Sequence, residues 1–443
     1  MSSESEKAGF RSWFEWFVHS EVTGSILLLA CAVVALIWAN SPLAESYFDL
    51  LHTCVGVSWG DASFELSLHH WINDGLMVIF FFVVGLEVKR ELVVGELSSF
   101  RKATLPVAAA LGGMVVPAVF FFALNIGGEG ARGWGIPMAT DIAFALGILA
   151  VFGSRAPLGL KVFLTALAIA DDLGAVAVIA LFYTEKINVV ALIVAGTLLL
   201  ALFVAIRARV NHLGILLPMI VGVWVAVFTS GLHATVAGIF VAMIIPVKPR
   251  LSVPHFIADT EDFLHDIRIA DTADEILVAD KHQLHAVENV RERASDILPS
   301  GLVLEHIFHP IQVWLILPLF ALANAGVAIG GNLMAVLASP LALGIVVGLV
   351  LGKPVGIGLL SWLAVKSGRG ALPDGVTWAQ VVGAGCLAGI GFTMSLFITD
   401  LAFDNETLIA TAKVGILAAS LVSGIIGYVV LSRTLPKGIG SEN

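Results

Sequence analysis

The chain has 443 residues, of which 58% are hydrophobic and only 13% are charged. Soluble proteins carry about 25% charged residues, so this composition excludes an ordinary soluble enzyme and indicates a polytopic helical membrane protein. The formal net charge of −10 comes largely from one acidic segment, residues 252–300. The cysteines at positions 31, 54 and 386 are odd in number and far apart, which excludes a disulfide framework.

Apolar runs of membrane-spanning length recur along the chain and predict twelve transmembrane helices. In chain order they cover about 22–39, 71–88, 104–124, 134–152, 162–182, 188–206, 213–229, 232–246, 310–329, 340–363, 378–399 and 409–431. Between the first two spans, residues 54–68 alternate apolar and polar side chains on both sides of Gly60-Asp61. This alternation is typical of a small β-hairpin. We expect one membrane domain over 1–443.

The basic residues predict how these spans are oriented. With twelve spans, fourteen Lys and Arg residues outside segment 247–308 fall on the side that holds both termini, and only Arg132, Lys186 and Lys413 fall on the other. The positive-inside rule therefore places both termini in the cytoplasm and the hairpin on the periplasmic side. We expect a bacterial inner membrane.

Charged residues deep in the predicted spans are the candidate functional residues. Asp171 and Asp172 interrupt the run 162–182, although a mid-bilayer carboxylate costs roughly 2.5–3.5 kcal/mol on insertion scales. Consecutive helix positions point about 100° apart, so one aspartate is expected to bind an ion and the other to pair or to share the cavity. Lys353 is the basic residue at similar depth, and its candidate partners are Asp141, Asp171 and Asp172. The plainer alternative is a buried charge pair that only fixes helix packing.

The fourth and eleventh spans contain helix-breaking sequences. The fourth carries Thr140-Asp141 after a proline, and the eleventh carries Gly389 and Gly391 in G-I-G-F-T-M-S. Two interrupted helices in corresponding halves of a chain point to a transporter's ion site, whereas packing kinks are the alternative. The two spans run in opposite directions, so spans 3–5 and 10–12 are expected to form inverted-topology repeats.

These residue types favour chemistry with a proton or a small hard cation. Burial disfavours an ionised carboxylate and a nearby lysine favours it, so one carboxylate can be poised to bind either H⁺ or Na⁺. Na⁺ prefers oxygen donors, which include the hydroxyl and carbonyl of Thr140. Competition between the two ions for one carboxylate is itself a mechanism of exchange.

Seven stretches give the chain a close resemblance to the NhaA-type sodium/proton antiporters. They occur in order: G-L-E-V-K-R-E-L (85–92), A-T-D-I-A-F-A-L-G (139–147), A-L-A-I-A-D-D-L-G-A (166–175), S-G-L-H-A-T (230–235), L-P-L-F-A-L-A-N-A-G-V (317–327), G-K-P-V-G-I (352–357) and G-I-G-F-T-M-S (389–395). The resemblance implies electrogenic exchange of cytoplasmic Na⁺ or Li⁺ for external protons by alternating access. It also implies a homodimer joined through the hairpin near 54–68, no cofactor and no nucleic-acid partner.

The resemblance assigns roles to individual residues. It makes Asp172 the principal Na⁺ ligand and Asp171 its essential partner, paired with Lys353. Asp141 and Lys353 would balance the dipole ends of the interrupted helices, and Thr140 would lie at their crossing. It further implies pH sensing by a group of residues at the cytoplasmic end of the second and ninth spans, namely Glu87, Arg90, Glu91, Glu305, His306 and His309. The resemblance also implicates His233 in pH sensing. From the residues alone, an ordinary basic membrane flank explains this group about as well.

Segment 252–300 departs from the pattern expected of this family and is interpreted as a cytoplasmic inserted loop. It contains eleven acidic and four basic residues. A regulatory element and a solvated spacer are the two interpretations of this loop. Three rival functions also stay open: an intramembrane aspartyl protease, a proton-coupled carrier of organic solutes, and a channel.

Overall fold

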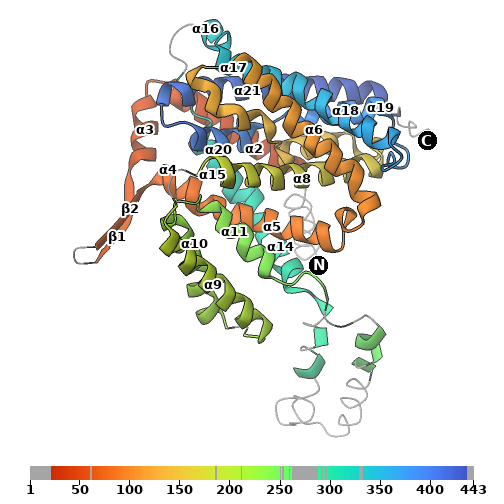
Figure 1. The fold of residues 1–443 in the computed structure, drawn as a ribbon. Coiled ribbons are helices and arrows are strands. Elements are labelled where there is room, and N and C mark those ends of the chain that lie inside the picture. Colours follow the sequence, from red (N-terminus) through yellow and green to blue (C-terminus); the bar gives the residue numbers. More distant parts are fainter. Residues whose placement is uncertain are drawn as a thin grey trace, which may run out of the picture.

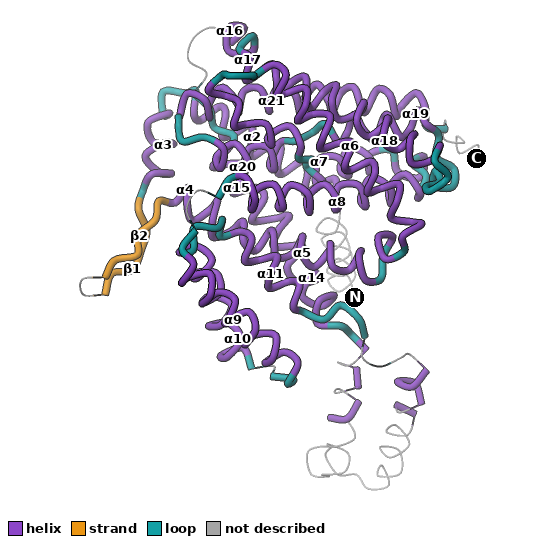
Figure 2. Tube along the Cα trace, viewed as in Figure 1, coloured by secondary structure: helices purple, strands orange, loops and turns teal. Residues whose placement is uncertain are grey.

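Helices run through most of the computed structural model (Figures 1 and 2). It describes residues 21–436 apart from 60–61, 185–186, 211, 250, 252–253, 259, 262–287, 291–292, 295–296 and 329–332. Five predicted spans are single helices, namely α2 (Glu21–Ala39), α6 (Phe100–Leu124), α8 (Leu158–Phe182), α9 (Val189–Arg207) and α21 (Glu406–Thr434). The predicted turn at Gly60-Asp61 and most of segment 252–300 lie outside the described residues.

Three further spans are helices with a π-helical stretch inside them. They are α4 (Leu68–His70), η1 (Trp71–Leu76) and α5 (Met77–Val93); α14 (Ser300–Ile311), η5 (Gln312–Ile316) and α15 (Leu317–Asn324); and α17 (Pro340–Val347), η6 (Gly348–Gly352) and α18 (Lys353–Lys366). Such π-bulges are frequent at functional sites. The helix of the ninth span begins at Ser300, whereas the sequence predicted a start near 310. Its first turns contain polar residues, so hydropathy did not include them in the span.

The remaining four spans are two bent pairs and two shorter helices. The bent pairs are η3 (Glu129–Met138) with α7 (Ile142–Val151) and α19 (Trp378–Ala388) with α20 (Phe392–Ala402), at angles of 42° and 46°. The shorter helices are α10 (Leu213–Thr229) and α11 (Thr235–Ile244). Within the described residues, these elements and the eight long helices confirm the twelve predicted apolar segments and the two interrupted ones.

The predicted hairpin is present as an antiparallel pair, β1 (Cys54–Trp59) and β2 (Ala62–Ser67), in which Val55 faces Leu66. Leu68, expected in the second strand, begins α4 instead, because Ser67 caps that helix by accepting a hydrogen bond from the amide of His70 (3.3 Å). Four short helices complete the described elements, namely α3 (Ala44–His52), η2 (Glu96–Ser98), η4 (Gly153–Arg155) and α16 (Leu333–Leu337).

The long helices pack in two groups (Figure 1). One group contains η3, α6 to α8 and α17 to α21; the other contains α5, α9 to α11, α14 and α15. Helix α2 packs against α15 of the second group and α7 of the first, so it lies at the boundary between them. The first group contains both bent pairs and the aspartates of α8. Because α8 also packs against α5 of the second group, the candidate site lies close to this boundary.

Close packing inside the first group depends on glycine. A Cβ on Gly112 of α6 would lie 2.0 Å from the carbonyl oxygen of Gly356 on α18. A Cβ on Gly356 would likewise lie 2.0 Å from the carbonyl oxygen of Gly112. Small residues let membrane helices approach in this way. The contact fixes α18, and hence Lys353 at its first residue, against α6.

Candidate ion site

The two bent pairs cross each other, and each satisfies backbone groups that the other leaves free. The amide of Asp141 donates to the carbonyl of Ile390 at 2.6 Å. Ser395 Oγ donates to the carbonyl of Ile136 at 2.7 Å. Unpaired backbone groups are costly at membrane depth, so these bonds explain how two helices can be broken there.

Two glycines allow the crossing to be tight. A Cβ on Gly391 would lie 3.2 Å from the carbonyl oxygen of Ala139 across the crossing. A Cβ on Gly389 would lie 2.4 Å from the carbonyl oxygen of Leu349. The two positions singled out in the sequence are therefore places where one backbone closely approaches another.

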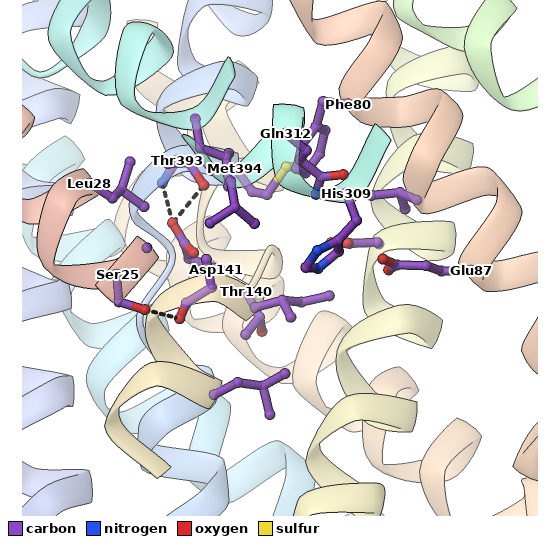
Figure 3. Close-up of a pocket in the computed structure, with 18 of the residues that line it drawn as sticks. Ser25, Leu28, Phe80, Glu87, Thr140, Asp141, His309, Gln312, Thr393 and Met394 are labelled. Atoms are coloured by element: carbon purple, nitrogen blue, oxygen red, sulfur yellow. Dashed lines mark hydrogen bonds between the residues drawn. The ribbon is translucent and has the colours of Figure 1, made fainter. Parts of the chain in front are cut away.

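Asp141 occupies the amino ends of two half-helices at once (Figure 3). Its Oδ1 accepts a hydrogen bond from the amide of Phe144 in the first turn of α7 (3.1 Å). Its Oδ2 accepts from the amide (3.0 Å) and the hydroxyl (2.6 Å) of Thr393 in the first turn of α20. Helix amino ends carry partial positive charge, which a carboxylate offsets.

Lys353 lies midway along Pro340–Lys366 and is 1% exposed, so it does not sit near a helix end. Its Nζ lies 2.6 Å from Asp171 Oδ2 and 2.9 Å from Thr140 Oγ1, and it also donates to the carbonyl of Met138 at the carboxyl end of η3. Thr140 Oγ1 lies 2.7 Å from Asp171 Oδ2 and 2.9 Å from the carbonyl of Ala388, either of which accepts its proton. The partner that the sequence left open among three aspartates is Asp171.

Asp172 has a different environment from its neighbour. Like Asp171 it is 1% exposed and has an Oδ1 with no hydrogen-bond partner among the described residues. It lines a cavity of about 160 Å³ together with Thr140, Asp141 and Thr393. The cavity lies between the two groups of helices, because its walls come from α5, α14 and η5 on one side and from α7, α8 and α20 on the other. No cluster of three or more His, Cys, Asp or Glu residues suited to a resident metal occurs in the described part of the chain.

The residues of the suggested pH-sensing group are divided between the cavity and its surroundings. Glu87 and His309 line the cavity and reach towards it from α5 and α14 (Figure 3). Arg90 Nε lies 3.4 Å from Glu305 Oε2, and Arg90 Nη2 lies 3.7 Å from Glu91 Oε1.

The two other histidines of that group lie outside the cavity wall. His306 is exposed on α14. His233 lies just before α11 and contacts the carbonyl of Tyr183 at 3.0 Å, whereas Lys89 donates to the carbonyl of Met243 at the opposite end of that helix. Helix α11 has 10 residues, a length of about 15 Å at 1.5 Å per residue. His233 is therefore well separated from the Glu87 end of the molecule.

A largely buried polar network at the hairpin end was not anticipated from the sequence. Lys413 Nζ lies 3.2 Å from Asp400 Oδ1, and Asn73 Nδ2 donates to Asp400 Oδ2 at 3.0 Å. Asn324 donates to Asn73 Oδ1 at 2.8 Å, and His69 contacts Asn324 Oδ1 at 3.1 Å. The signal that could have revealed it is the recurrence of polar residues within one or two turns of four predicted span ends.

Three phenylalanines in ring contact lie between this network and the cavity. Phe397 of α20 contacts Phe81 of α5 and Phe320 of α15, with ring centroids 5.4 and 6.4 Å apart. All three rings are at most 1% exposed. Each of these three spans carries a cavity residue, then a phenylalanine, then a network residue towards the hairpin end, with the network residue of the α5 span in η1. Two layers therefore lie between the site and that end.

Carboxylates and a lysine held between crossed half-helices, beside a cavity between two helix groups, define a secondary ion transporter. The model of the family described as "Na+/H+ antiporter 1" matches residues 15–431, and the chain belongs to that family.

Proteins named Na(+)/H(+) antiporter NhaA are similar over nearly their whole length. The one from Oleidesulfovibrio alaskensis is 48% identical, with 96% of this chain and 94% of the relative covered. The one from Wolinella succinogenes is 46% identical (97% and 94% covered), and one from Helicobacter pylori is 46% identical (94% of both). The predicted family and the polytopic helical membrane fold are thereby confirmed.

Proposed function

We propose that the protein exchanges Na⁺ or Li⁺ for protons electrogenically, with the carboxylate of Asp172 binding either the cation or a proton. One observation carries this proposal: Asp172 lines the cavity and has an unpartnered oxygen, whereas Asp171 does not line the cavity and is held through its Oδ2 by Lys353 and Thr140. A buried carboxylate without a partner strongly favours binding a cation or a proton over staying bare.

Electrogenic exchange requires unequal numbers of protons and cations per cycle, and we propose that protons are in excess. The site offers proton acceptors beyond Asp172, because Asp171 and Lys353 form a buried pair whose proton content depends on the charge beside it. We propose that a cation at Asp172 changes the charge that this pair experiences and so releases protons from the site. Asp141 stays bound to two helix ends and keeps the crossing assembled.

The position of the cavity between two groups of helices supports the proposal of alternating access. The cavity reaches exposed His309 at one end, and the phenylalanine layer and the polar network lie towards the other. We propose that this is a state open towards the Glu87 end, which the distribution of basic residues assigns to the cytoplasm. We further propose that the protein lies in a bacterial inner membrane and that a second copy docks through the hairpin at 54–68.

The charged residues at the Glu87 end are proposed to adjust exchange to pH. Glu87 and His309 line the route to Asp172, so their charge changes the local concentration of cations and protons. Arg90, Glu91 and Glu305 form an adjacent ion-pair network that links α5 to α14. His306 on the same helix, and less directly His233, are proposed to contribute through charge alone.

The rival functions make different predictions in sealed vesicles. A channel conducts without coupling, so adding Na⁺ would not by itself collapse the proton gradient. A carrier of organic solutes would move protons only with its solute, and a protease would move none. Adding Na⁺ or Li⁺ to everted vesicles loaded with a pH-sensitive dye, and scanning pH, tests the proposal: cation-dependent loss of the proton gradient supports it, and no response to any cation overturns it.

A further inference from the structure

Gln312 lines the cavity of Asp172 and carries a buried side-chain oxygen that has no partner among the described residues. It is the first residue of η5, a π-helical turn between α14 and α15. Its side chain lines the cavity (Figure 3), and the residue is 8% exposed. Its Oε1 is buried and has no hydrogen-bond partner in the described part of the chain. A buried amide oxygen without a partner is costly, and such groups need an explanation.

The surroundings of Gln312 suggest what its amide binds. Asp172, on the opposite wall of the same cavity, also has an unpartnered oxygen. An alkali cation prefers several oxygen donors, and a neutral carbonyl oxygen adds a donor without adding charge. A cavity of about 160 Å³ has room for several water molecules. A partly hydrated cation can therefore contact both side chains, directly or through one water.

Resting on the exchange function above, we propose that the side-chain oxygen of Gln312 is an additional donor for the transported cation on its way between the cavity mouth and Asp172. The π-helical turn supports this role, because such turns shift a side chain relative to the regular helix and are frequent at functional sites. The amide contributes to cation binding but not to proton binding, since a carboxylate needs no second donor to hold a proton. Gln312 thus favours the cation in its competition with H⁺.

The test measures cation affinity by two routes. In everted vesicles at fixed pH, Gln312→Leu removes the donor at similar volume and is expected to raise the apparent KM for Na⁺ and Li⁺ by about three- to tenfold, the loss of roughly one hydrogen-bond equivalent. The maximal rate should change little. Gln312→Glu, which keeps oxygen donors at this position, is expected to have a KM at or below that of the wild type. Calorimetric titration of the purified protein with NaCl or LiCl should show the same order of affinities.

A matched control removes a different buried polar group. Ser361 Oγ is also buried without a partner, but Ser361 does not line the cavity. Ser361→Ala should leave the KM unchanged. The inference is overturned if Gln312→Leu binds and transports cations with wild-type affinity, if it lowers only the maximal rate, or if Ser361→Ala raises the KM equally. If Asp172→Asn binds Na⁺ as the wild type does, the proposed ion site itself is wrong. The KM of Gln312→Leu tests only the role of Gln312, so the two failures can be told apart.

Discussion

Lys353 Nζ and Asp171 Oδ2 are 2.6 Å apart in the middle of the protein, and each residue is 1% exposed. The ion pair gives the two adjacent aspartates different environments: Asp171 is held by a lysine and a threonine, and Asp172 faces a cavity. A helix carries consecutive side chains about 100° apart. The asymmetry of the site therefore follows from the position of Lys353 on α18.

Replacement of Lys353 tests this pair. Lys353→Ala leaves Asp171 buried without its cation, and breaking a buried pair costs about 3–5 kcal/mol. The thermal unfolding temperature in detergent should fall and the pH range of exchange should shift. In the double variant Asp171→Asn/Lys353→Ala, which buries no unpaired charge, most of the stability should return. Equal unfolding temperatures of the wild type and Lys353→Ala would contradict the pairing.

The hydrogen bond between Thr393 and Asp141 tests the crossing of the half-helices. Thr393→Val removes a 2.6 Å bond to a carboxylate at nearly constant volume. Bonds to charged groups contribute about 1.5–3 kcal/mol, so the variant should unfold at a clearly lower temperature. Thr399→Val is the matched control, because the hydroxyl of Thr399 on the same helix donates only to the carbonyl of Ser395 at 2.8 Å. Equal decreases in unfolding temperature for the two variants would contradict a stronger contribution from the hydrogen bond to Asp141.

Glycine substitutions test the contact between α6 and α18. In Gly356→Ala the new methyl group meets the backbone of Gly112, and overpacking of this kind costs about 1–3 kcal/mol or more. Gly358→Ala, two residues further on, meets no heavy atom nearer than 3.8 Å. Size-exclusion profiles and thermal unfolding should show a loss for the first variant alone. A well-folded Gly356→Ala protein would contradict the close approach.

The layers at the hairpin end predict a cross-link that arrests transport. Asn73 and Asp400 belong to different groups of helices and are in side-chain contact at 3.0 Å. In a cysteine-free background, Asn73→Cys/Asp400→Cys should stop exchange when a disulfide or a short bifunctional reagent joins the two residues, and reduction should restore it. The pair Asn73→Cys/Asn324→Cys, within one group, is the control that should still transport. Full exchange by the cross-linked first pair would exclude opening at this end.

The sequence predicts the twelve spans because length and apolarity are local properties, which the bilayer enforces. The interrupted spans are also local, since Pro137 and Gly389 break helices by their own backbone chemistry. The pairing of Lys353 with Asp171 joins residues 182 positions apart, so no local pattern selects it over two other aspartates. The sequence did not single out Gln312, because its span was predicted from a run of apolar residues and one amide in such a run does not by itself indicate a site.

The proposal that Asp172 is the residue for which Na⁺ and H⁺ compete is tested most directly by cation-induced dequenching of a pH dye in everted vesicles. The wild type and Asp374→Asn, which makes the same change at an exposed aspartate, are expected to collapse the proton gradient when Na⁺ is added. Asp172→Asn is expected to show no response at any pH or cation concentration, and Asp171→Asn almost none. Full Na⁺-dependent proton movement by Asp172→Asn would contradict the assignment of the ion site.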